Sequence, residues 1–190
     1  MNKQPQITEQ TRKNITDTFW KHYLDKPIEK ITVREVAATA GYSRATFYEY
    51  FSDVYAVLEY IENDLLLFIQ NSITEHIKNI SAGAIDLTVV ICLYEEKGDY
   101  LTKLLGKDGD PMFADRMKSV LKPILAQLMQ IDLQDTELQF AFEYTVSAII
   151  GALIYWYPKR ETLSTEMVSK MIMELLCNGS MGFIAKRTYK

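Results

Sequence analysis

The chain has 190 residues, of which 48% are hydrophobic, and its formal net charge at pH 7 is −4. This apolar content is ample for a buried core, so a disordered chain is excluded, and two cysteines are too few for a disulfide-rich scaffold. With only 8 glycines, 5 prolines and helical spacing of apolar residues through nearly the whole chain, the sequence predicts an all-α protein.

The first predicted helix covers residues 7–24. Ile7, Ile15, Phe19 and Tyr23 recur at helical spacing and define one apolar face. A Lys-Pro step then ends the helix, because proline cannot continue it. We expect this face to pack across the two helices that follow.

Residues 32–51 predict two short helices joined by a tight turn. Thr32 and Glu35 are spaced as a capping box, in which each side chain satisfies a backbone N–H group at the start of a helix. Gly41 permits positive φ where this helix must end. Ser43 can cap a second helix over residues 44–50. This is the layout of a helix-turn-helix.

The second of these helices separates its side chains onto two faces. Phe47 and Phe51 predict a small core with Val36 and Ala40, and the other face is polar. Against DNA, arginine can pair with guanine, an alanine methyl can contact thymine, and hydroxyl groups can reach phosphates. The residues predicted to contact DNA are Thr32, Arg34, Tyr42, Ser43, Arg44, Ala45, Thr46, Tyr48 and Tyr50.

The charge is distributed unevenly along the chain. Residues 1–50 contain 8 Lys and Arg against 6 Asp and Glu, a net charge of +2, which leaves −6 for the remainder. A mildly basic N-terminal part is compatible with binding to phosphates, but +2 supports that interpretation only weakly.

The remaining chain predicts five more helical stretches. They comprise a long helix over 53–78, ended or kinked by residues 81–83, a helix over 87–105 bent near Gly98, and, after a loop at 106–111, helices over 112–129, 134–157 and 167–179. We divide the chain into a DNA-binding domain, 1–52, and a helical ligand-binding and dimerisation domain, 53–190. Cys92 and Cys177 lie among apolar residues and are predicted to be buried free thiols.

The segment 144–157 is the most apolar part of the chain. It is shorter than the roughly 20 residues that a membrane span needs, so we interpret it as a buried helix. Small residues at its centre let a second helix approach closely. The face predicted to pair with a second subunit comprises Tyr144, Ala148, Gly151, Ala152, Tyr155, Met171 and Leu175. The alternative is an ordinary core within one chain.

Aromatic and methionine side chains of the C-terminal part can form an adaptable apolar wall. The candidates for a ligand pocket are Tyr94, Met112, Phe113, Met117, Phe140 and Tyr144. The same residues can also be plain core. No nucleophile with a neighbouring base, glycine-rich phosphate loop or metal-ligand spacing occurs, and His22 and His76 are isolated on predicted helix surfaces. We therefore predict no enzymatic activity, no cofactor and no metal site.

The first third of the chain resembles the TetR-type (tetracycline-repressor-like) transcriptional regulators. The resemblance is carried by Thr11-Arg12, Ile15, Phe19, Thr32-Val33-Arg34-Glu35-Val36-Ala37, Ala40-Gly41, Ser43-Arg44-Ala45-Thr46-Phe47-Tyr48, Tyr50-Phe51 and Leu58. It implies a cytoplasmic homodimer without membrane association that binds double-stranded DNA at a near-palindromic operator. It further implies a repressor that responds to a small-molecule effector, here unknown, with the last two long helices of each subunit forming the dimer interface.

Two positions depart from the pattern of this family. Tyr42 stands where valine or isoleucine is common, and Val54 stands where a lysine commonly meets a phosphate. The second departure keeps open another interpretation, a TetR-like co-activator or adaptor that binds a protein partner instead of operator DNA. A ligand-carrying or catalytic helical bundle ranks below both.

Overall fold

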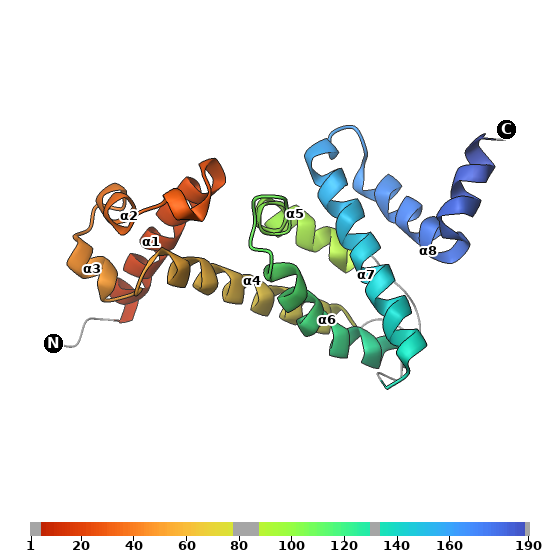
Figure 1. The fold of residues 1–190 in the computed structure, drawn as a ribbon, viewed down its shortest axis with the longest axis horizontal. Coiled ribbons are helices and arrows are strands. Elements are labelled where there is room, and N and C mark those ends of the chain that lie inside the picture. The colour runs from red at the N-terminus through yellow and green to blue at the C-terminus, as the bar shows by residue number, and fades with distance from the viewer. Residues whose placement is uncertain (1–4, 78–87, 130–133, 189–190) are drawn as a thin grey trace. The chain divides into compact units, whose positions relative to one another are not determined.

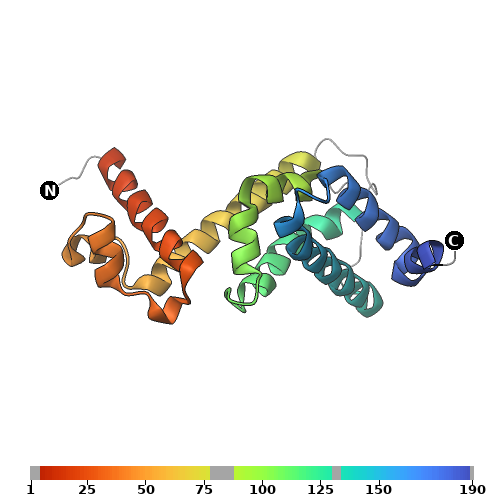
Figure 2. The same cartoon turned by 90° about the horizontal axis from the view of Figure 1, so that it is seen from above.

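The structure is a computed structural model that describes residues 5–77, 88–129 and 134–188. This part of the chain is helical throughout and contains no strand, so the predicted all-α class is confirmed (Figures 1 and 2). Its α-helices are α1 (Pro5–Asp25), α2 (Val33–Thr39), α3 (Arg44–Tyr48), α4 (Val54–Ile77), α5 (Thr88–Leu104), α6 (Phe113–Met129), α7 (Thr136–Trp156) and α8 (Thr165–Thr188). Two short 3₁₀ helices accompany them, η1 (Ile28–Lys30) and η2 (Tyr157–Lys159).

The chain forms two compact units, Met1–Leu67 and Phe68–Lys190. The boundary between them falls inside α4. The division by function at residues 52 and 53 stays a prediction.

In the first unit, α1 and the helix-turn-helix share one core. Ile15 and Phe19 of α1, Val36 of α2 and Phe47 of α3 are all fully buried. Ile7 does not belong to this face, because 57% of it is exposed in the first turns of α1, where the buried face has not yet begun. The packing of α1 against α2 follows from the apolar residues at helical spacing, as expected.

The turn between α2 and α3 has the predicted glycine conformation. Gly41 has φ of 79°, and its N–H donates to the carbonyl oxygen of Ala38 while the N–H of Tyr42 donates to that of Ala37. These two bonds form a Schellman motif, which satisfies the carbonyl groups left free at a helix end. Helix α3 is shorter than predicted and ends at Tyr48, because the backbone turns before Phe51 returns to the core.

In the second unit, α5 packs against α7, η2 and α8 (Figure 2). The predicted bend of α5 lies at Lys97, which has non-helical φ and ψ of −127° and 16°, directly before Gly98. Pro123 lies inside α6. The predicted break at residues 81–83 lies outside the described residues.

Helix α7 is not the buried helix that we predicted, at least within one chain. Tyr144 and Tyr155 are 62% and 64% exposed. By length and composition, residues 136–159 would also suffice to cross a membrane, so the prediction that the apolar segment is too short for a membrane span was wrong. A single such helix is weak evidence for a membrane span. The two cysteines are free but exposed, which corrects the prediction of buried thiols.

Candidate nucleic-acid interface

Side-chain caps fix the start of both helices of the helix-turn-helix. Thr32 Oγ1 accepts a hydrogen bond from the N–H of Glu35 at 3.2 Å, and Ser43 Oγ accepts one from the N–H of Thr46 at 3.0 Å. Because the Thr32 hydroxyl acts here as acceptor, its own proton stays available to a further acceptor such as a phosphate oxygen. The Ser43 hydroxyl also lies 3.0 Å from that of Thr46.

The outward face of the helix-turn-helix carries the predicted DNA contacts. Within the first unit, Arg34, Arg44, Ala45 and Tyr48 are exposed, whereas Phe47 between them is fully buried. The buried Phe47 side chain anchors α3 to the core, so the helix backbone that carries the side chains of the opposite face keeps one orientation. Of the remaining predicted contacts, Thr32 and Ser43 are exposed, and Tyr42, Thr46 and Tyr50 are half-buried.

Arg12 of α1 ties this face to the rest of the unit. Its guanidinium carbon lies 5.9 Å from the ring centre of Tyr50 and 5.7 Å from that of Tyr60, and its Nη1 lies 2.9 Å from Glu9. The Tyr60 ring in turn meets Phe51 edge-on. These cation–π contacts hold the aromatic side chains beside α3 in place.

A second connection joins α1 to the turn. Asn14 Nδ2 donates a hydrogen bond to the hydroxyl oxygen of Tyr42 at 2.8 Å, and Gln10 Nε2 donates to Asn14 Oδ1 at 2.8 Å. The four-residue spacing of Gln10 and Asn14 is visible in the sequence. Their link to Tyr42 is not, because 28 residues separate Asn14 from it.

The loop after α1 is tied to α2 by an ionic cluster. Lys26 Nζ donates to both carboxylate oxygens of Glu35, at 2.7 and 2.8 Å, and His22 Nδ1 lies 3.6 Å from the same carboxylate. This contact corrects the prediction that His22 is isolated. The hydrogen bond from Lys26 holds the pKa of Glu35 below its ordinary value of 4.5, with smaller contributions from His22 and the backbone of Thr32.

This cluster predicts an acid-sensitive helix-turn-helix. Because the folded state lowers the pKa of Glu35, the stabilisation is fully present above pH 4.5 and is lost as the pH falls through the lower, folded-state pKa. The Glu35→Gln variant lacks this titration, so its free energy of unfolding should decline less steeply as the pH falls below 4.5. Chemical denaturation between pH 3 and 6 measures it, and an unchanged slope would show that the contact adds nothing at this half-buried position.

Residue 54 cannot supply the phosphate contact that a lysine would make. Val54 is 6% exposed, and it belongs to the core of the first unit. Asp53 before it accepts a hydrogen bond from the N–H of Ala56 at 2.8 Å, which caps α4. The N-terminus of α4 therefore carries a carboxylate and no cation at this position.

The predicted pairing face lies mostly in the open within one chain. Tyr144, Ala148, Gly151 and Tyr155 of α7 are exposed, and a Cβ atom added at Gly151 would meet nothing within 4 Å. Ala152, Met171 and Leu175 are half-buried. These four exposed positions on one side of an apolar helix form a strip that none of the described residues of the second unit covers.

The six predicted pocket residues fall into two environments. Tyr94, Phe113 and Met117 are buried, whereas Met112, Phe140 and Tyr144 are exposed. Phe140 and Tyr144 do line one open hollow on α7, together with Glu143, Ser147 and Ala148. Burial raises the pKa of the Tyr94 hydroxyl, which has no hydrogen-bond partner among the described residues.

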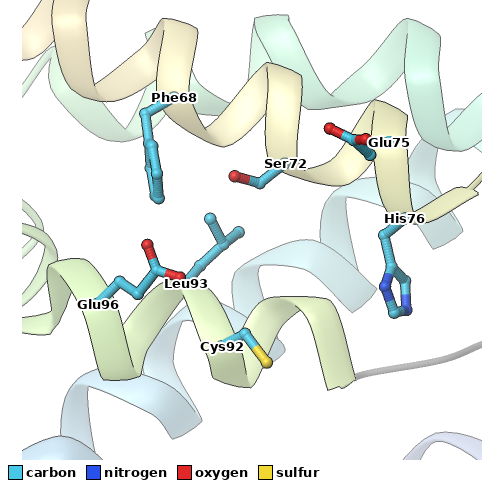
Figure 3. Close-up of a pocket in the computed structure, with 7 residues that line it drawn as sticks. All are labelled: Phe68, Ser72, Glu75, His76, Cys92, Leu93 and Glu96. Atoms are coloured by element: carbon cyan, nitrogen blue, oxygen red, sulfur yellow. The ribbon is translucent and has the colours of Figure 1, made fainter.

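Another hollow lies between α4 and α5 in the second unit, with a volume of about 260 Å³ (Figure 3). None of its lining residues was predicted from the sequence, because they come from two helices and are mostly polar. They are Phe68, Ser72, Glu75, His76, Cys92, Leu93 and Glu96. In Figure 3 the Phe68 ring and the Leu93 side chain extend into the space between the two helices.

Comparisons with known proteins match both parts of the chain. Residues 20–61 match the family described as bacterial regulatory proteins of the tetR family, and residues 87–178 match a transcriptional regulator C-terminal region. The structure is similar to that of the fatty acid degradation regulator FadR from Bacillus halodurans, with a TM-score of 0.70 and 16% identity. That similarity covers 95% of this chain and 98% of the other. Among curated proteins, none matches this sequence.

Proposed function

Because this chain belongs to the tetR family of bacterial regulatory proteins and is a DNA-binding transcriptional regulator, we propose that it is a ligand-responsive repressor. It binds a near-palindromic operator as a cytoplasmic homodimer and has no catalytic role. The observation that carries this proposal is the outward face of the helix-turn-helix, where Arg34, Arg44 and Tyr48 are exposed around the fully buried Phe47. That face combines donors for base edges with donors for phosphates.

A gel-shift titration tests the proposal. The probe is duplex DNA flanking the gene of this protein, compared with a random-sequence duplex of the same length. We expect a complex that forms more tightly on the flanking DNA and weakens steeply with salt, because phosphate contacts release counterions. Equal affinity for both duplexes would contradict an operator in that region.

Within this function, Arg44 is expected to specify sequence and Tyr48 to contact the phosphate backbone. Arg44→Ala should cost about 1–3 kcal/mol on the operator and relax the preference for one base pair, because it removes a bidentate contact. Tyr48→Phe serves as the matched change at a neighbouring exposed position and should weaken all sequences alike. Competition titrations measure both. An equal loss on operator and random DNA for Arg44→Ala would rule out its base-reading role.

A second candidate function is a TetR-like co-activator or adaptor that binds a protein partner. The observation that favours it is Val54, which is packed in the core where a phosphate-binding lysine is common in the family. Under this alternative, neither duplex would bind at physiological salt, and the outward face would contact a protein.

The dimer of this proposal uses the exposed strip on α7. Small side chains at Ala148 and Gly151, flanked by Tyr144 and Tyr155, suit close packing of two helices around a two-fold axis. A second copy would cover an apolar surface that a single soluble chain would otherwise leave in water. Met171 and Leu175 of α8 would complete the interface.

For the effector, we propose the hollow between α4 and α5. Its volume of about 260 Å³ suits a small ligand, and its wall offers both apolar and polar groups. Glu75 and Glu96 supply carboxylates, and none of the described lining residues is a lysine or arginine, although Lys97 Nζ lies 5.1 Å from the ring centre of Phe68. A ligand with donor groups is therefore favoured. Native mass spectrometry of the purified protein would detect such a ligand if it co-purifies.

A further inference from the structure

Three side chains form a directed chain of hydrogen bonds from α1 to the turn of the helix-turn-helix. Gln10 Nε2 donates to Asn14 Oδ1, and Asn14 Nδ2 donates to the hydroxyl oxygen of Tyr42, both at 2.8 Å. Gln10 is exposed, whereas Asn14 and Tyr42 are half-buried. Tyr42 therefore lies at the edge of the surface that carries the predicted DNA contacts.

The direction of these hydrogen bonds decides whether the Tyr42 hydroxyl can donate to a further group. An amide oxygen only accepts and an amide NH₂ group only donates, so the bond from Gln10 turns the NH₂ group of Asn14 towards Tyr42. The hydroxyl of Tyr42 then acts as acceptor, and its single proton is left to point at another acceptor. A tyrosine whose oxygen already accepts a hydrogen bond is also a stronger donor, because the bonds polarise one another.

A phosphate oxygen is an acceptor that such a hydroxyl fits. Ionised phosphates only accept hydrogen bonds, and most protein contacts to DNA go to phosphate and sugar groups. Tyr42 directly precedes Ser43, which caps α3, so its backbone lies at the start of α3. Val54 is buried and cannot provide a phosphate contact, so the protein needs anchors from other positions.

We propose that Asn14 is a positioning residue for DNA binding, which holds the Tyr42 hydroxyl as a hydrogen-bond donor to a backbone phosphate. Gln10 sets the direction of the Asn14 amide. The proposal rests on the DNA-binding function proposed above and adds two residues of α1 that do not themselves contact DNA. It also gives a role to Tyr42, the position at which this chain departs from its family.

A double-mutant cycle tests the link between Asn14 and Tyr42. Asn14→Ala and Tyr42→Phe should each weaken binding about ten-fold, because a hydrogen bond to a charged group is lost or left undirected. The loss should be equal on operator and random duplex, and the salt dependence should not change, because no charge is removed. The double variant should bind no more weakly than Tyr42→Phe alone. Full additivity would overturn the proposal, as would a loss confined to the operator, since that marks a base contact.

Gln10→Glu provides an independent test that changes only an exposed side chain. The new carboxylate can only accept, so it should draw the Asn14 NH₂ group towards itself and turn Oδ1 towards Tyr42. The Tyr42 hydroxyl would then donate its hydrogen bond to Asn14 Oδ1 and no longer to the phosphate. We expect Gln10→Glu to weaken binding to random duplex several-fold more in the presence of Tyr42 than in the Tyr42→Phe background, where only charge repulsion remains. An equal effect in both backgrounds overturns the proposal. If the unchanged protein bound neither duplex, the proposed function would fail first, and this inference with it.

Discussion

Leucine in place of Gly151 should convert the proposed dimer into a monomer. Gly151 lies at the centre of the exposed strip on α7, flanked by Ala148 and Tyr155. Overpacking a close contact costs about 1–3 kcal/mol, and a two-fold axis places the change in both subunits, so the dimer Kd should rise roughly thirty-fold or more. Sedimentation velocity at micromolar concentration measures the change.

The fold of a single chain should tolerate this substitution. A Cβ atom at Gly151 would meet nothing within 4 Å, and leucine has a higher helix propensity than glycine. Loss of the dimer with an unchanged helical circular-dichroism signal would therefore locate the interface rather than report unfolding. Gly151→Ala is the matched control, because it adds only one methyl group and should leave most of the dimer intact. A leucine variant that sediments as a dimer would place the interface elsewhere.

Alanine in place of Gly98 should destabilise the second unit strongly. Gly98 is buried beside the kink at Lys97, and a Cβ atom there would overlap the ring of Tyr157. The ring cannot move aside freely. Its hydroxyl donates to Asp99 Oδ1 at 3.1 Å, and the guanidinium carbon of Arg160 lies 4.2 Å from its centre. We expect a loss of about 1–3 kcal/mol in the free energy of unfolding, measured by urea denaturation.

The cause of this loss can be isolated by shrinking the side chain that Gly98 faces. In a Tyr157→Leu background the ring is absent, so the same Gly98→Ala change should cost much less than in the unchanged protein. Tyr157→Leu alone will lower stability, because it removes the hydrogen bond to Asp99 and the contact with Tyr94. An additive double variant would mean that the cost of alanine at position 98 comes from the backbone of α5 and not from the overlap.

The sequence alone determined the helix-turn-helix almost completely. The caps at Thr32 and Ser43, the positive φ of Gly41 and the burial of Phe47 all lie where the sequence predicts them. The reason is that caps, turns and helical faces depend on residues no more than a few positions apart, so their physics is visible in the spacing. The order of the helices in the second unit follows in the same way.

Tertiary structure alone decided the contacts between helices and the exposure of their faces. The bond from Asn14 to Tyr42, the cluster of Lys26 with Glu35 and the ring of Tyr157 beside Gly98 join residues that no spacing rule connects. The prediction that α7 is buried was wrong for a single chain, because an apolar pattern indicates that a face favours burial but not which chain buries it. Within the described part of the chain the crossing of the helices leaves Tyr144 and Tyr155 exposed, and only the packed arrangement shows this exposure.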